Sequence, residues 1–422
     1  MHHKIPVTQL GSSGPVMARA IEACVHCGFC LPACPTYRVL GEEMDSPRGR
    51  ILLMKSALEG SVATRDTLPF VDRCLGCLAC VSACPSGVRY DELLPLYRGH
   101  VQRVRRHSPA ERLTRTLVHL TLPSPALSRL AFRVGRIVKP LAARLPGPLA
   151  AMLDLLPASV PKARPLPALT RAIGKRRARV ALLPGCVQSA VAPEIGWATV
   201  RVLAHNGVEV VVPADHGCCG ALDWHTGRLA AARDFARRAL VDFPVDVDAV
   251  ITDAAGCGSA MKEYGLLFEG ESNRAEASSF AARVKDVSEF LIELGPVRTR
   301  PLPAPLTLAY HDACHLAHAQ RITSAPRALL SCIENVTLLE VEESDVCCGS
   351  AGTYNIEQPA LAARLGERKA RHILATQAQA VVMGNIGCMI QLRSHLTRLG
   401  ASMPVLHTVE VLHRAYDHAQ DP

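Results

Sequence analysis

The pattern of apolar and polar positions changes twice along the chain, and each change marks a change in the predicted structure. The first hundred residues suit short helices. One helix is predicted over residues 47–58, because Ser46 is a favourable N-cap and Pro47 suits the first helical position. A second, short helix is predicted with Pro69 near its start. Residues 1–20 contain glycine-rich turn material and predict a loose lead-in.

Residues 101–178 form a basic, proline-rich stretch in which one long helix is excluded. Between the prolines lie short segments, such as residues 127–139, where basic residues alternate with Leu, Phe, Val and Ile. Three interpretations are open at this stage: a segment lying on an anionic lipid surface, a docking surface for a partner subunit, or a helical linker packed on the ferredoxin domain. No nucleic-acid partner is expected, because a recognised fold and base-stacking aromatic residues are lacking.

From residue 179 onward, short β-rich runs alternate with helical segments, which is the pattern of an α/β domain. Four landmarks occur twice in the same order: a strand-like run before a cysteine, a Cys-Cys-Gly triplet, a strand-like run before Gly-Cys, and a helix start with glutamate. The two copies of these landmarks begin at residues 180 and 308, 210 and 339, 250 and 381, and 286 and 407. This order predicts a duplication, with repeats over residues 179–300 and 301–422.

Composition indicates the number of domains, the cellular compartment and the kind of site to expect. The chain has 422 residues, enough for several domains, and 17 cysteines. No export signal and no run of about 18 apolar residues is found, so we expect a cytoplasmic protein without a membrane span. Clustered cysteines in a reducing compartment predict metal ligation. Residues 101–180 hold 17 lysines and arginines but only two carboxylates, Glu111 and Asp154, so the excess positive charge is concentrated there.

Two cysteine runs in the first hundred residues share the spacing C-x2-C-x2-C-x3-C-P of bacterial-type ferredoxins. In that motif, three closely spaced thiolates bind one [4Fe–4S] cluster, and the fourth cysteine binds the neighbouring cluster. One cluster is therefore assigned to Cys24, Cys27, Cys30 and Cys84, and the other to Cys74, Cys77, Cys80 and Cys34. Zinc sites are the alternative, but zinc ligands usually come as two separated C-x2-C pairs.

Two arginines near the start of the predicted helix, Arg48 and Arg50, have two interpretations. They offset the negative charge of nearby thiolate-ligated clusters, or they belong to a solvated first helical turn.

Each repeat contributes four cysteines that follow or close a strand-like run. We therefore expect the thiols to converge on one edge of a parallel sheet. They are Cys186, Cys218, Cys219 and Cys257 in the first repeat, and Cys314, Cys347, Cys348 and Cys388 in the second. Eight thiols at matched positions indicate a metal or redox-active thiol site, with buried structural cysteines as the alternative.

Several further residues lie near or outside this pattern. Cys332 belongs to neither set and is expected to pack in a core. His311, His315 and His318 flank Cys314, and His216 precedes Cys218. These histidines are interpreted as proton donors or as groups that hydrogen-bond cluster ligands, or else as locally satisfied side chains.

With these motifs in this order, the chain resembles the iron–sulfur subunits of glycolate oxidase along nearly all its length. Residues 45–55, Asp-Ser-Pro-Arg-Gly-Arg-Ile-Leu-Leu-Met-Lys, favour that family over the architecturally similar lactate-utilisation, anaerobic glycerol-3-phosphate dehydrogenase and heterodisulfide reductase proteins. The resemblance implies an α+β multidomain fold. A mainly helical two-cluster ferredoxin domain (residues 1–100) and a linker (residues 101–178) would precede duplicated α/β CCG, or cysteine-rich, domains.

The repeats depart from the full CCG pattern, which ends in C-x2-C and can hold a noncubane cluster on five cysteines. Here Ala260 and Gln391 occupy the positions of the last cysteine. Four ligands remain in each repeat, enough in number for an ordinary cubane cluster. The resemblance therefore implies two [4Fe–4S] clusters in the ferredoxin domain and leaves open one or two further clusters in the repeats.

The sequence contains no G-x-G-x-x-G fingerprint after a strand, so no flavin or nicotinamide site is expected on this chain. The resemblance implies an electron-transfer subunit whose partners are FAD-binding subunits that oxidise glycolate, with a membrane quinone or another final acceptor. Lactate and glycerol-3-phosphate are alternative substrates, and a thiol–disulfide enzyme is the alternative of another class. The expected location is the cytoplasm, either free or peripheral on the cytoplasmic face of the inner membrane.

Overall fold

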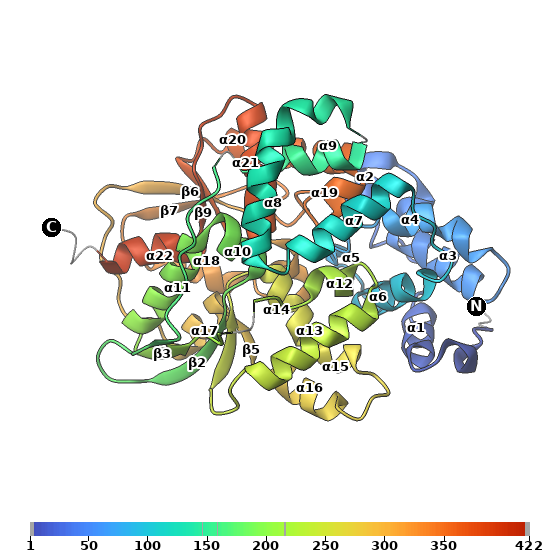
Figure 1. The fold of residues 1–422 in the computed structure, drawn as a ribbon, viewed down its shortest axis with the longest axis horizontal. Coiled ribbons are helices and arrows are strands. Elements are labelled where there is room, and N and C mark those ends of the chain that lie inside the picture. Colours follow the sequence, from blue (N-terminus) through green and yellow to red (C-terminus); the bar gives the residue numbers. More distant parts are fainter. Residues whose placement is uncertain (1–3, 146, 158, 215–216, 418–422) are drawn as a thin grey trace.

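The computed structural model describes residues 4–145, 147–157, 159–214 and 217–417. A helical N-terminal part lies beside two sheets, and each sheet is covered by helices (Figure 1). This arrangement agrees with the fold class expected from the sequence.

The helical part, up to Val101, is built from short elements. Its helices are α1 (Ser13–Glu22), α2 (Pro35–Leu40), α3 (Pro47–Leu58), α4 (Leu68–Asp72), α5 (Ala79–Ser82) and α6 (Tyr90–Val101), with 3-10 helices η1 (Val7–Leu10), η2 (Glu43–Asp45) and η3 (Thr64–Thr67). Helix α3 starts as predicted, since the Ser46 hydroxyl accepts a hydrogen bond from the Gly49 amide at 3.0 Å. Helix α4 has Pro69 in its first turn, as predicted.

The prediction of a loose lead-in over residues 1–20 is wrong for residues 4–20, the part of that segment that the structure describes. Helix α1 buries Val16, Met17 and Ile21, each at most 2% exposed, and packs on α6. Gly14 serves close packing rather than a free loop, because a Cβ there would lie 2.3 Å from the Val7 carbonyl oxygen.

Three helices follow in the basic stretch. They are α7 (Pro109–Thr121), α8 (Pro125–Val138) and α9 (Gly147–Asp154), with the 3-10 helix η4 (Lys139–Arg144) between the last two. Ser108 caps α7 in a capping box with Glu111, and Ser124 caps α8. Helix α8 packs on α10 and α9 packs on α19, so the stretch lies over the repeats (Figure 1). Among the described residues, no helix combines the length and the apolar character needed to cross a bilayer.

The first sheet has five strands in the order β1-β3-β2-β4-β5, parallel except for β1. The strands are β1 (Leu169–Thr170), β2 (Ala178–Leu183), β3 (Val208–Val211), β4 (Ala249–Thr252) and β5 (Val284–Asp286). The helices around it are α10 (Cys186–Val191), α11 (Pro193–His205), α12 (Ala221–His225), α13 (Leu229–Asp242), α14 (Ala255–Lys262), α15 (Tyr264–Leu267), α16 (Arg274–Ala282) and α17 (Val287–Leu294).

The second sheet is fully parallel, in the order β7-β6-β8-β9. The strands are β6 (Leu306–Tyr310), β7 (Val336–Glu340), β8 (Ala380–Met383) and β9 (Val405–His407). The helices are α18 (Ser324–Ser331), α19 (Tyr354–Glu357), α20 (Pro359–Ala375), α21 (Ile386–Arg398) and α22 (Thr408–Asp417), with a π turn, η5, at His315–Ala319. Its strand order repeats β3-β2-β4-β5 of the first sheet, so the sequence duplication is also a structural one.

The two repeats share one hydrophobic core, whereas the helical part packs with the first repeat in a second core. A third, smaller cluster joins the Cys74 loop, through Leu75 and Cys77, to Cys347 and Tyr354 of the second repeat. Backbone bonds also link the repeats, with the Ala255 amide donating to the Gly384 carbonyl at 3.1 Å. The carboxyl ends of the strands in both sheets are thereby brought towards the cysteine loops of the helical part.

Candidate functional site

The two ferredoxin-type loops have the same backbone course. The second and fourth residues after the first cysteine are left-handed in both loops, with φ of +55° at His26 and +91° at Gly28, and of +64° at Gly76 and +63° at Leu78. Such a φ is uncommon for histidine and leucine, and it curls each loop tightly. At Gly28 a side chain would be strained by the φ of +91°, and a Cβ at 2.8 Å from Nη1 of Arg48 would also displace that side chain.

The first centre lies near the surface. One small cavity is lined by the four cysteines assigned to the first cluster, and Cys80 reaches it too. Cys27 is exposed, and Cys24, Cys30 and Cys84 are partly buried. Two apolar side chains beside them, Val25 and Phe29, are 67% and 65% exposed. The loop therefore presents a thiol and an apolar rim to the outside.

The second centre is enclosed. Cys34, Cys74, Cys77 and Cys80 line a second small cavity, and the first three of these are buried. The Gly76 amide donates to the Cys74 sulfur at 3.4 Å, and the Tyr90 hydroxyl does so at 3.7 Å. Donors to sulfur tune the reduction potential of a thiolate-bound cluster. The protein, rather than solvent, would therefore set the reduction potential of a cluster held at this centre.

Both sets of thiols fit a bound iron–sulfur cluster. Each set gathers four sulfurs around one cavity, although the chain brings them from two distant loops. Burial raises the pKa of Cys30 to about 11 and raises that of Cys77 and Cys80 well above the ordinary thiol value. Thiol ligands must be deprotonated to bind metal. The positive charge of bound iron would stabilise these buried thiolates, which burial alone disfavours.

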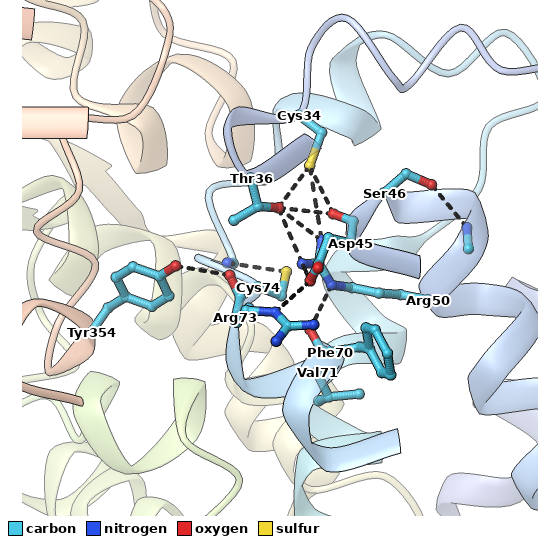
Figure 2. A network of polar contacts seen from close by, with 12 residues as sticks. Cys34, Thr36, Asp45, Ser46, Arg50, Phe70, Val71, Arg73, Cys74 and Tyr354 are labelled. Atoms are coloured by element: carbon cyan, nitrogen blue, oxygen red, sulfur yellow. Dashed lines mark hydrogen bonds and ion pairs between the residues drawn. The ribbon is translucent and has the colours of Figure 1, made fainter. Parts of the chain in front are cut away.

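Arg50 lies at the centre of a polar network beside Cys34 (Figure 2). Its guanidinium pairs with Asp45 at 3.0 Å, donates to Thr36 at 3.1 Å and approaches the Cys34 sulfur at 3.8 Å. Burial works against the charge, but the surrounding groups, first among them Cys74, raise the Arg50 pKa above its ordinary value. The side chain is 1% exposed, so the interpretation of Arg50 as part of a solvated turn is wrong.

Arg48 is placed differently. It pairs with Glu43 at 2.7 Å and donates to the His26 carbonyl in the first loop at 3.0 Å, while its side chain stays 30% exposed. The two arginines thus brace different loops, and only Arg50 is a buried positive charge beside a ligand sulfur.

In the first repeat, the four cysteines follow the carboxyl ends of β2, β3 and β4, as predicted. Hydrogen bonds from Cys186 and Cys219 lower the Cys218 pKa, and the pKa values of those two donors are raised. Cys186, Cys218 and Cys219 are buried, and Cys257 is partly buried. The thiols therefore interact as one group.

The second repeat gathers the four matching cysteines, but here the second cysteine of the Cys-Cys pair has the lowered pKa, and a histidine is added. The sulfurs of Cys314 and Cys347 are 4.0 Å apart, and hydrogen bonds from Cys347 and Cys388 lower the Cys348 pKa. A ring nitrogen of His311 and the sulfurs of Cys348 and Cys388 lie within 4.8 Å of one another, all buried. Imidazole and thiolate are ligands that zinc and iron share, so this group can hold a metal. The first repeat has Leu183 at the matching position.

The other singled-out residues have different outcomes. His318 is satisfied by Ser82 of helix α5 in the helical part and by the Asp345 carbonyl, each at 3.0 Å. His315 bonds the Gly76 carbonyl in the Cys74 loop at 3.0 Å. His216 lies outside the described residues. Cys332 is exposed, so its predicted core position is wrong: it forms the C-cap of the amphipathic helix α18 on the side away from the core.

His225 was not found by sequence reasoning. It ends α12, and its ring lies 4.6 Å, centroid to centroid, from that of His315. Its local sequence contains no motif, because the residue whose ring it contacts, His315, is ninety residues away in the chain. The pair connects the first repeat, the second repeat and the Cys74 loop.

Comparison with known proteins agrees with this arrangement. The 4Fe-4S dicluster domain family matches residues 20–88, and the cysteine-rich domain family, CCG, matches residues 180–262 and 308–393. The Escherichia coli glycolate oxidase iron-sulfur subunit is 37% identical over 97% of this chain and 99% of its own length. The probable glycolate oxidase iron-sulfur subunit of Bacillus subtilis is 35% identical over 94% of each chain.

A more distant relative, lactate utilization protein A of Oceanobacillus iheyensis, is 27% identical over 56% of this chain and 96% of its own length. The two glycolate oxidase subunits match across both cysteine loops, the basic helices and both repeats, since their alignments span nearly the whole chain. With its dicluster domain and paired cysteine-rich domains, the chain belongs to the family of glycolate oxidase iron–sulfur subunits.

Proposed function

We propose that the chain is the electron-transfer subunit of a complex in which separate FAD-binding subunits oxidise glycolate to glyoxylate and a membrane quinone is the final acceptor. The observation that carries the proposal is the order of the cysteine centres. An exposed centre at Cys27 adjoins a buried centre at Cys77, and the buried centre packs on the thiols of the second repeat. Such an order leads from the surface to the interior of the repeats.

The proposed ligands are those expected from the spacing, four cysteines for each cluster, with Cys34 and Cys84 exchanged between the loops. A [4Fe–4S] cluster accepts and releases one electron at a time, which suits the transfer of a two-electron oxidation to a distant acceptor. Two residues of the chain act on the ligand sulfurs of the buried centre. Arg50 places a buried positive charge at Cys34, and Tyr90 donates to Cys74.

The rim of the first loop is the proposed docking site for the flavin subunit. Val25 and Phe29 are exposed next to Cys27, and large exposed apolar side chains are typical of interaction sites. A flavin subunit docked there would lie next to the outermost centre and would exclude water from it.

The experiment that tests the function uses the complex of this chain with its flavin subunits, purified without oxygen. Glycolate is expected to bleach the visible absorbance of the iron–sulfur clusters, and a short-chain quinone is expected to restore it. Lactate and glycerol-3-phosphate, added separately, identify the substrate. If glycolate reduces the flavin while the cluster absorbance and EPR signal stay unchanged, the proposed electron-transfer role is wrong.

We also propose that α8 lies on the membrane. Its Leu130, Val134 and Ile137 are 57%, 52% and 79% exposed, and Arg133 and Arg136 lie exposed on the same helix. A basic amphipathic helix of this kind binds anionic lipid surfaces.

Replacing Arg133, Arg136 and Lys139 with glutamine is expected to weaken binding to anionic vesicles about a hundredfold at low salt, at about 1 kcal/mol for each basic residue. Vesicle sedimentation measures this. The control changes Lys162, Arg171 and Lys175, which have the same charge and are exposed outside these helices. Equal loss in both triple variants would mean that net charge rather than α8 controls the binding.

A further inference from the structure

A cavity of about 730 Å³ lies between the basic helices and the cysteine centres. Helices α7, α8 and α9 form one wall, to which Val118, Leu130 and Met152 contribute. The opposite wall contains Cys74 and all eight cysteines of the repeats. Small-molecule sites have volumes of about 300–1,000 Å³ and are mostly apolar with a few polar groups, and this cavity fits that description.

The charged side chains at the cavity wall are already engaged. Arg105 pairs with Asp72, and Arg115 pairs with Glu357 at 2.7 Å. Arg98 donates to the backbone carbonyls of Cys74 and His225, at 2.6 and 2.8 Å. An anionic substrate would have to break one of these arrangements, so the wall favours an uncharged, apolar ligand.

The cavity wall continues to the outer surface along α8. Leu127, Leu130 and Val134 line the cavity, yet they are 42%, 57% and 52% exposed. They follow one another at helical spacing, on the helix that we propose to lie on lipid. A ligand with a long apolar tail can therefore place its head in the cavity and leave the tail among these side chains.

The inner end of the cavity offers hydrogen-bonding groups. The imidazoles of His225 and His315 both line it. Nε2 of His225 is shielded from solvent and has no hydrogen-bond partner among the described residues. Such an unpartnered atom costs free energy unless a ligand or water satisfies it. Asn355 and Asn385 add amide groups to the same wall.

We propose that this cavity binds the ring of a lipid-soluble quinone, with its tail leaving along α8 and its carbonyl groups towards His225 and His315. The proposal rests on the proposed function and adds the place of the acceptor. The quinone takes up two electrons and two protons, and its two carbonyl groups become hydroxyl groups. The 2-hydroxy acid oxidised on the flavin subunit supplies the two electrons and releases two protons. The ring would then lie against the thiols of both repeats and Cys74.

The test is a titration of the full chain, purified anaerobically with its clusters, with decylubiquinone followed by calorimetry. Ala131 lines the cavity, whereas Ala126, on the same helix, is exposed and lies outside it. We expect Ala131→Trp to weaken decylubiquinone binding at least tenfold and Ala126→Trp to leave it within twofold. Iron content and the circular dichroism melting curve show that both variants are folded.

Each outcome decides the matter. Unchanged binding to a folded Ala131→Trp variant, equal weakening in both variants, or no binding to the parent chain would overturn the proposal. A photoreactive quinone provides a second measurement, and its label is expected on peptides of α7–α9. A parent complex whose clusters glycolate bleaches, while decylubiquinone does not bind, defeats this inference alone. Failure of glycolate to bleach the clusters defeats the proposed function, whatever the titration gives.

Discussion

Replacing Cys27 with serine is expected to remove one ferredoxin-type cluster and to stop the transfer of electrons from the flavin subunits to quinone. A serine hydroxyl is a poor substitute for a thiolate ligand of iron, and iron–sulfur clusters are held by cysteine thiolates. Because Cys27 is exposed, the change leaves no cavity in a core. Iron and acid-labile sulfide are expected to fall by about four atoms of each per chain, with loss of one EPR signal.

The matched control is Cys332→Ser, the same chemical change at an exposed cysteine outside every cysteine centre. It is expected to leave the iron content and the rate unchanged. Reduction of the flavin by glycolate should survive in both variants, because the substrate site is proposed on the partner. A normal rate of quinone reduction in Cys27→Ser would show that electrons take another route.

Replacing Arg50 with methionine is expected to destabilise the chain by about 3–5 kcal/mol, because the change leaves the Asp45 carboxylate buried without its partner. Arg73 also pairs with Asp45, at 2.8 Å, which places the expected loss at the lower end. The midpoint of urea unfolding measures the effect. Loss of the positive charge beside Cys34 is also expected to lower the reduction potential of the cluster bound there.

Two comparisons separate charge from packing in this experiment. Arg48→Met removes a part-exposed ion pair between α3 and Glu43 of η2, for which a loss of about 1 kcal/mol or less is expected. The double variant Arg50→Met with Asp45→Asn removes both charges and is expected to recover part of the loss. Equal stability of the Arg48 and Arg50 variants, or no recovery in the double variant, would contradict a buried ion pair as the cause.

Much of this structure could be predicted from the sequence because the patterns that determine it lie within short segments. Ser46 and Pro47 mark the start of α3 within a few residues, and both fall where predicted. The landmarks of the repeats predicted parallel strands with cysteines after their ends, and the two sheets share one strand order. Regular spacing of cysteines likewise points to clusters, since ligand spacing is set by the metal group itself.

What the sequence could not supply depends on contacts between distant segments. The burial of α1 against α6, the exposure of Cys332 and the approach of His225 to His315 follow from packing rather than from local pattern. Arg50 is another such case. Arg48 has the same charge and lies two residues earlier in the sequence, but on nearly the opposite face of the helix, and only Arg50 is enclosed.

The enclosure of the Cys74 loop has a consequence for the biogenesis of the protein. Cys77 is 8% exposed because Cys347, Tyr354 and Leu361 of the second repeat pack with it in one cluster. A scaffold protein that delivers a preformed cluster needs access to the receiving thiols, and the docked repeat blocks that access. We therefore expect a cluster at this centre to be loaded before the C-terminal repeat docks, while the N-terminal part is still open.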